Sequence, residues 1–99
     1  MKIVEIRDIE YCLDGSVICD MILDCPVSRS LIDYLGTYGE MKYHAEFKRP
    51  FFRLQIPRLG TIKGVEGNRT LRVVFTTSST ESNKYLQDII NRFELCLVA

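Results

Sequence analysis

Three cations and one aromatic residue are the side chains whose types and spacing most suggest binding chemistry. Arg53, Lys63 and Arg72 each lie within a short segment of alternating apolar and polar residues, and Phe51 precedes Arg53 by two positions. If these segments pair as neighbouring strands, the cations lie abreast, with roughly 5 Å between successive Cβ atoms. Like charges directly opposite one another cost stability, so an anion beside this basic row (Arg53, Lys63 and Arg72) would relieve that cost.

Three interpretations of the basic row are open. The cations could extend into solvent and cover apolar neighbours with their aliphatic stems. They could pair with acidic residues of the first hairpin, within the sheet or across a two-fold dimer; these residues are Asp8, Glu10, Asp20 and Asp24. With Phe51, they could instead bind RNA or DNA, but the net charge of zero counts against this third interpretation.

Catalytic and metal chemistry find little support in the sequence. His44 is the single histidine, and it stands between Lys42 and Glu46 without a nucleophile motif, so we expect an exposed surface histidine. Asp8, Asp20 and Asp24 could in principle hold a hard cation such as Mg²⁺ or Ca²⁺, but an exposed polar sheet face is the commoner arrangement. We predict no catalytic residue, no metal ligand and no cofactor.

The cysteines lack the paired spacing of a zinc site, and a chain of this size does not need cross-links to hold a core. We expect buried or idle thiols at Cys12, Cys19, Cys25 and Cys96. A small enzyme or ligand sensor is kept as an alternative, with a pocket between sheet and helices near Tyr34, Tyr38, Tyr43 and Tyr85.

Length and composition indicate a single domain over residues 1–99. The apolar fraction of 46% and the charged fraction of 26% are those of a globular protein. No apolar run reaches the roughly 18 residues of a membrane span, and Glu5 comes too early for a signal peptide. We expect a cytoplasmic protein with no membrane partner.

The N-terminal half predicts a hairpin and a helix. Residues 2–12 and 17–24 alternate as strands, joined by a three-residue loop in which Gly15 takes the left-handed position. In this register Tyr11 pairs with Val17, Ile9 with Cys19, and Asp8 with Asp20. A helix is predicted over 26–38, with Pro26 in its first turn and Gly39 as its cap.

The C-terminal half predicts four strands, at 41–47, 51–56, 60–66 and 69–76, and a last helix. The turns at 57–59 and at Gly67-Asn68 align the last three strands so that one face is apolar. Phe51, Val65 and Thr70 then line one side of the basic row, and Gln55, Thr61 and Val74 line the other. Ser78 with Glu81 forms a capping box for the helix.

The predicted fold is α+β, with the order ββαββββα and two helices on one face of a single antiparallel sheet. After the first strand, this order is similar to the repeat unit of TATA-box-binding proteins, whose DNA contact lies on the face away from the helices. We expect a non-catalytic interaction domain that self-associates as a dimer, through the open sheet face or the apolar tail 95–99. A nucleic-acid-binding module is the alternative.

Overall fold

Alternating apolar and polar residues organise most of the chain into one six-stranded sheet. The computed structural model describes residues 1–76 and 80–93. Its elements follow the predicted order: β1 (Ile3–Tyr11), β2 (Val17–Leu23), α1 (Arg29–Leu35), β3 (Glu40–His44), β4 (Phe51–Ile56), β5 (Gly60–Val65), β6 (Thr70–Phe75) and α2 (Thr80–Asn91).

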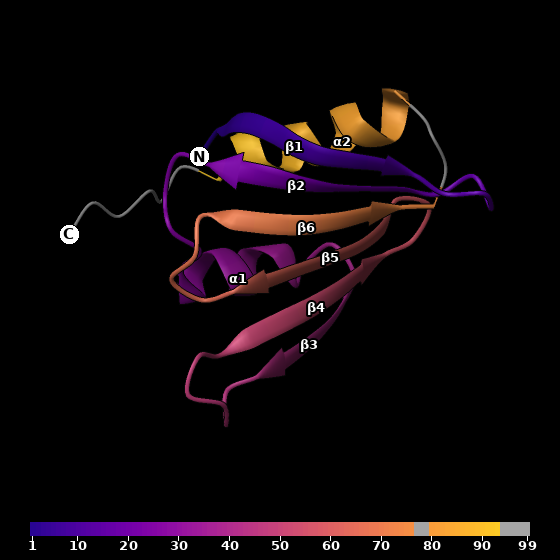
Figure 1. Ribbon diagram of the computed structural model, residues 1–99. Helices are drawn as coiled ribbons and strands as arrows, with labels where there is room; N and C mark the ends of the chain where they lie inside the picture. Colours follow the sequence, from indigo (N-terminus) through magenta and orange to yellow (C-terminus); the bar gives the residue numbers. More distant parts are fainter. Residues whose placement is uncertain (77–79, 94–99) are drawn as a thin grey trace.

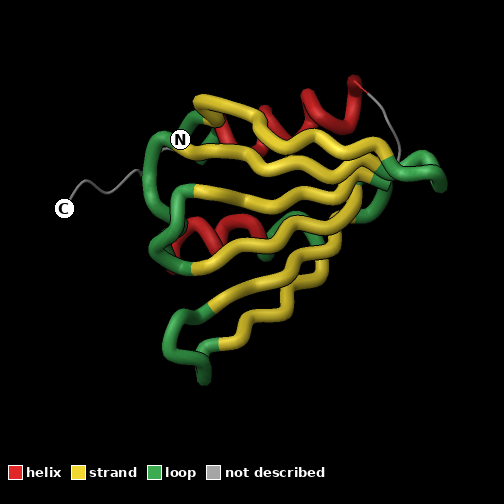
Figure 2. Tube along the Cα trace, viewed as in Figure 1, coloured by secondary structure: helices red, strands yellow, loops and turns green. Residues whose placement is uncertain are grey.

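All neighbouring strands are antiparallel, and the strand order across the sheet is β1-β2-β6-β5-β4-β3. Both helices lie behind the same face of the sheet, α2 behind the β1–β2 side and α1 behind β6 and β5 (Figure 1). No described helix or loop crosses the other face, which is turned toward the viewer (Figure 2). The predicted fold class is therefore confirmed. We call the uncovered side the open face.

The core lies between the sheet and the helices. In β2, every second residue is buried, because only one face of the strand meets the helices. Leu31, Ile32 and Leu35 of α1 are buried against this face, as are Leu86, Ile89 and Ile90 of α2. Tyr85 lies on the solvent side of α2 with 47% of its surface exposed, and so not in the expected pocket between sheet and helices.

The register of the last three strands is as predicted. Gly60 pairs with Ile56 and with Phe75, and Gly64 pairs with Phe52 and with Leu71. The turn after β5 differs in detail from the predicted two-residue loop. Asn68 N–H donates to the Val65 carbonyl (3.0 Å), which makes Gly67, at φ 92°, the third residue of the turn. The pairing of β5 with β6 is unaffected by this difference.

The first hairpin departs from the predicted register. Tyr11 pairs with Val17 as expected, but Arg7, not Asp8, lies opposite Asp20. The cause is a bulge between Arg7 and Glu10, where Asp8 adopts a φ of 53° and the strand gains one residue. Ile9 therefore does not pair with Cys19, and it is exposed. A second irregularity lies between Ile3 and Glu5.

The first helix is shorter than predicted. Ser28 is its N-cap, since the Ser28 hydroxyl accepts a hydrogen bond from Leu31 N–H (3.1 Å), and Gly36 is its C-cap. Gly39 has a different function: a Cβ there would lie 2.1 Å from the Gln55 carbonyl oxygen, so only glycine lets the two backbones approach. Ser78, the predicted cap of the last helix, lies outside the described residues.

The cysteines behave differently from one another. Cys12 and Cys19 are free, but Cys25 is disulfide-bonded, so the expectation of an idle thiol is wrong at that position. Cys96 and the rest of the apolar tail lie outside the described residues. Within residues 1–76 and 80–93, no helix is long and apolar enough to cross a membrane.

Candidate binding site on the open face

Arg53, Lys63 and Arg72 lie abreast on the open face. Arg53 of β4 pairs with Lys63 of β5, and Lys63 pairs with Arg72 of β6. All three side chains are exposed. The same row continues onto β3, where Lys42 pairs with Arg53. Four cations on four neighbouring strands span about 14 Å, since strands lie roughly 4.8 Å apart.

The row ends in an ion pair on its other side. Asp20 of β2 lies opposite Arg72, and its Oδ1 accepts a hydrogen bond from Arg72 Nη1 at 3.3 Å. Asp20 is the more enclosed partner, with 20% of its side chain exposed against 53% for Arg72. Among the described residues, Lys42, Arg53 and Lys63 make no ion pair. Most of the positive charge of the row is therefore uncompensated.

An aromatic cluster lies beside the cations, at the start of β4. His44 pairs with Phe51 across β3 and β4, and their rings stack with centroids 4.7 Å apart and planes 26° from parallel. A strand was predicted over 41–47, but β3 ends at His44, and Phe47 lies in the β3–β4 connection with 53% of its surface exposed. The centroid of the Phe47 ring lies 5.1 Å from that of Phe51 and 6.3 Å from that of His44. His44 is thus half-buried in a ring cluster, contrary to the expected exposed histidine.

A cavity of about 510 Å³ joins the cations to this cluster. Its cationic lining comes from the basic row, and its aromatic lining comes from His44, Phe51 and Phe52. The volume lies within the range of roughly 300–1,000 Å³ that is typical of ligand sites. We call it the Phe51 cavity. The predicted binding residues Phe51, Arg53, Lys63 and Arg72 all line it.

Two polar residues complete the rim of the Phe51 cavity. Asn68, in the β5–β6 turn, and Thr70, at the start of β6, both line it and both are half-buried. The Asn68 backbone is engaged, since its carbonyl accepts from Val27 N–H (2.7 Å). Among the described residues, the side chains of Asn68 and Thr70 have no hydrogen-bond partner. Their donors and acceptors are available to a ligand. Neither residue was predicted to bind, although Thr70 was expected along one side of the row.

The predicted acidic patch is not assembled. Asp20 is paired with Arg72, and Asp8 lies in the bulge of β1. Asp24 accepts a hydrogen bond from the backbone N–H of Lys2 (2.9 Å), at the far end of the hairpin. Asp20, opposite Arg72, and Glu10, opposite Ile18, keep their expected places on the open face. The Arg72–Asp20 ion pair is one instance of the pairing within the sheet that the sequence left open. The bulge separates these acids, because it replaces Asp8 by a cation at the position opposite Asp20.

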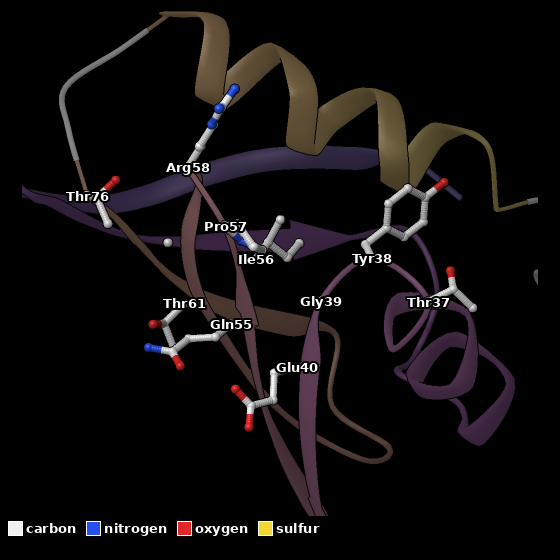
Figure 3. Close-up of a pocket in the computed structure, with 11 residues that line it drawn as sticks. Thr37, Tyr38, Gly39, Glu40, Gln55, Ile56, Pro57, Arg58, Thr61 and Thr76 are labelled. Carbon is white, nitrogen blue, oxygen red and sulfur yellow. The ribbon is translucent and has the colours of Figure 1, made fainter.

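A second cavity, of about 750 Å³, lies at the β4–β5 turn, the opposite end of these strands. Its polar side chains diverge: Tyr38 and Arg58 lie on one side of the strands, whereas Glu40, Gln55 and Thr61 lie on the other (Figure 3). A charged ligand would meet few of them at once. This larger cavity is therefore the weaker candidate.

The four tyrosines of the predicted ligand pocket do not converge. The Tyr34 hydroxyl donates to the Ile89 carbonyl (2.7 Å) and lies 3.0 Å from the Tyr38 hydroxyl. The Tyr43 hydroxyl donates to Glu66 at 3.2 Å, elsewhere in the fold. Burial raises the pKa of Tyr34 to about 12, with a further contribution from Tyr38. These hydroxyls hold the helices and turns in place.

Within the described part of the chain, no three His, Cys, Asp or Glu side chains are grouped so that they could hold a metal ion. Comparison of the chain with protein families, with curated proteins and with solved structures finds no match. The open face is therefore the feature of this protein that indicates a function.

Proposed function

We propose that this protein is a non-catalytic binding domain whose open face binds single-stranded nucleic acid. One observation carries the proposal: the basic row and the His44–Phe51 stack line the same cavity. Domains that bind single strands combine a positive groove for the backbone with aromatic rings on which bases stack. An acidic peptide would use the cations but not the stacked rings.

The local charge supports this proposal despite the net charge of zero. Lys42, Arg53, Lys63 and Arg72 lie in one line on the open side. Asp20 is next in that line, and beyond it lies Arg7, which is ion-paired with Glu5 (2.7 Å). Backbone affinity depends on the phosphates that are neutralised at the site, so a local row is sufficient. Glu40 lies beside Lys42 and Arg53 on the same face and makes no ion pair among the described residues. Acids farther than about 10 Å from the row affect it mainly through long-range attraction, which salt screens.

Self-association, the interpretation favoured by the sequence, has lost one of its two supports. It relied on an acidic patch facing the basic row, and that patch is divided by the bulge in β1. Both sheet edges are also poorly suited to pairing with a second sheet: β1 is irregular at two points, and β3 has only five residues, with Lys42 at its centre. Association through the tail 95–99 stays a prediction, and light scattering tests it.

Fluorescence anisotropy with a labelled single-stranded 12-mer at about 50 mM salt tests the proposed function. The variant Arg53→Ala/Lys63→Ala/Arg72→Ala should lose most of the binding, because it removes the contacts to phosphate. The matched control is Lys2→Ala/Lys84→Ala/Arg92→Ala, which removes the same charge from exposed positions outside the open face. The control should bind nearly as well as the wild type. Equal losses in both variants, or no binding by the wild type, would contradict the proposal.

A further inference from the structure

Resting on the proposed function, we infer that the Phe51 cavity holds one base of the strand and prefers adenine. The cavity offers three kinds of contact at once: a ring surface, a cationic wall and an unused amide. Each corresponds to one part of a nucleotide. Together the three contacts indicate that the ligand is a nucleotide. They also predict a preference for one base, which the basic row alone does not.

The ring surface is Phe51. One face of its ring is stacked on His44, whose centroid lies 4.7 Å away, and the ring lines the cavity. A base stacked there would extend an existing stack. Base–aromatic stacking contributes roughly 1–3 kcal/mol per base by alanine substitution.

The cationic wall fixes where the phosphate goes. Arg53 is two residues from Phe51 on β4, on the same face of the sheet, and Lys63 and Arg72 follow on the next two strands. The phosphate of a nucleotide whose base is stacked on Phe51 would therefore lie over the basic row. Val65 and Thr70 lie in line with Phe51 and form the floor between the ring and the β5–β6 turn.

The amide of Asn68 reads the base edge. It stands at the turn end of the cavity, where the edge of a base stacked on Phe51 would point, and it has no hydrogen-bond partner among the described residues. An Asn amide can donate and accept at once, which matches the N6 amino group and N7 of adenine. The Thr70 hydroxyl adds a second group that can serve as donor or acceptor.

Anisotropy with labelled oligo-dA, oligo-dT and oligo-dC 12-mers tests this inference. The wild type should prefer oligo-dA roughly tenfold, within the discrimination that one bidentate contact provides. Asn68→Ala should remove that preference and leave the affinity for oligo-dT unchanged. Its turn should persist, because the Asn68 backbone makes the hydrogen bonds to Val27 and Val65. Thr70→Val, which keeps the shape of the side chain, should weaken the preference without loss of thermal stability.

Gln55→Ala is the matched control, since Gln55 is exposed on the same strand and face but on the other side of the basic row. It should change neither preference nor affinity. Phe51→Ala should weaken binding of every base-bearing 12-mer and spare an abasic 12-mer. Equal affinity for the three sequences, unchanged by Asn68→Ala, would overturn the adenine assignment and leave the proposed function standing. Failure of all three to bind would overturn the proposed function itself.

Discussion

Arg72 and Asp20 face each other across β6 and β2, and their ion pair closes the basic row on one side. The pair has a direct consequence for binding, because Asp20 competes with any phosphate for the Arg72 guanidinium. Arg72 is half-exposed, so solvent screens the pair and its contribution to folding is small.

Replacing Asp20 by Asn should therefore strengthen nucleic-acid binding. An exposed ion pair is worth up to about 1 kcal/mol, so the expected gain in affinity is up to about fivefold. The free energy of unfolding should change by less than about 1 kcal/mol. Asp88→Asn, on the exposed side of α2, is the control for net charge. If the two variants gain equally, the effect is one of overall charge and not of Arg72.

The two free cysteines should differ in reactivity. Cys12 is half-exposed at the end of the first hairpin, whereas Cys19 is buried with 4% of its surface exposed. Burial, and next the negative charge of Asp20, raise the pKa of the Cys19 thiol, which lowers its thiolate fraction. Iodoacetamide at pH 8 should modify Cys12 at least about tenfold faster than Cys19, by the reasoning that the thiolate is the nucleophile. Peptide mass spectrometry measures both rates, and equal rates would contradict the packing of β2.

The ionisation of Tyr34 makes the free energy of unfolding depend on pH in the alkaline range. Its folded-state pKa of about 12 lies above the ordinary value of 10.0, so folding favours the protonated phenol. The contribution of this group is complete below about pH 10 and is lost as the pH rises to about 12. Urea unfolding at intervals over this range should show a smaller decline for Tyr34→Phe than for the wild type. At pH 7 the free energy of unfolding of Tyr34→Phe should be about 1 kcal/mol lower than that of the wild type, because the variant lacks the hydrogen bond to the Ile89 carbonyl. Parallel declines would contradict the assignment.

Two glycines after α1 should respond differently to alanine. A Cβ on Gly39 would lie 2.1 Å from the Gln55 carbonyl oxygen, so the backbones must separate, at an expected cost of about 3 kcal/mol or more. A Cβ on Gly36 would meet only ordinary contacts, the closest at 3.4 Å, and should change stability by less than about 1 kcal/mol. Thermal unfolding followed by circular dichroism compares them. Similar melting temperatures would show that the α1–β3 connection does not lie against β4.

The basic row could be predicted because short turns fix the register from β4 to β6. A three-residue loop and a tight turn leave one alignment that keeps Phe52, Ile62 and Val73 on the same face. Lys42 and His44 were placed on the outward side of their strand, but the longer connection to β4 left their partners undetermined. Their contacts with Arg53 and Phe51 come from the pairing of β3 with β4.

The register of the first hairpin was predicted wrongly for a physical reason. Residues 3–11 contain no glycine or proline to mark a bulge, and their apolar residues suit more than one register. Asp8 takes a positive φ, which Asp tolerates better than most residues, and the extra residue moves Arg7 opposite Asp20. The sequence did not indicate Asn68 as a binding residue, because a turn signal predicts the backbone conformation and not the surroundings of the side chain. Only the structure places Asn68 in the same cavity as Phe51.

The salt dependence of binding tests the central claim most directly, that the open face neutralises phosphates of a single strand. With four cations in contact, the logarithm of the association constant should fall with the logarithm of salt concentration with a slope of about −3, near −0.7 for each phosphate contact. In Arg53→Ala/Lys63→Ala/Arg72→Ala the slope should become shallower and lie between about −1 and zero. A wild-type slope near zero, or an equal slope in the triple variant, would contradict the account.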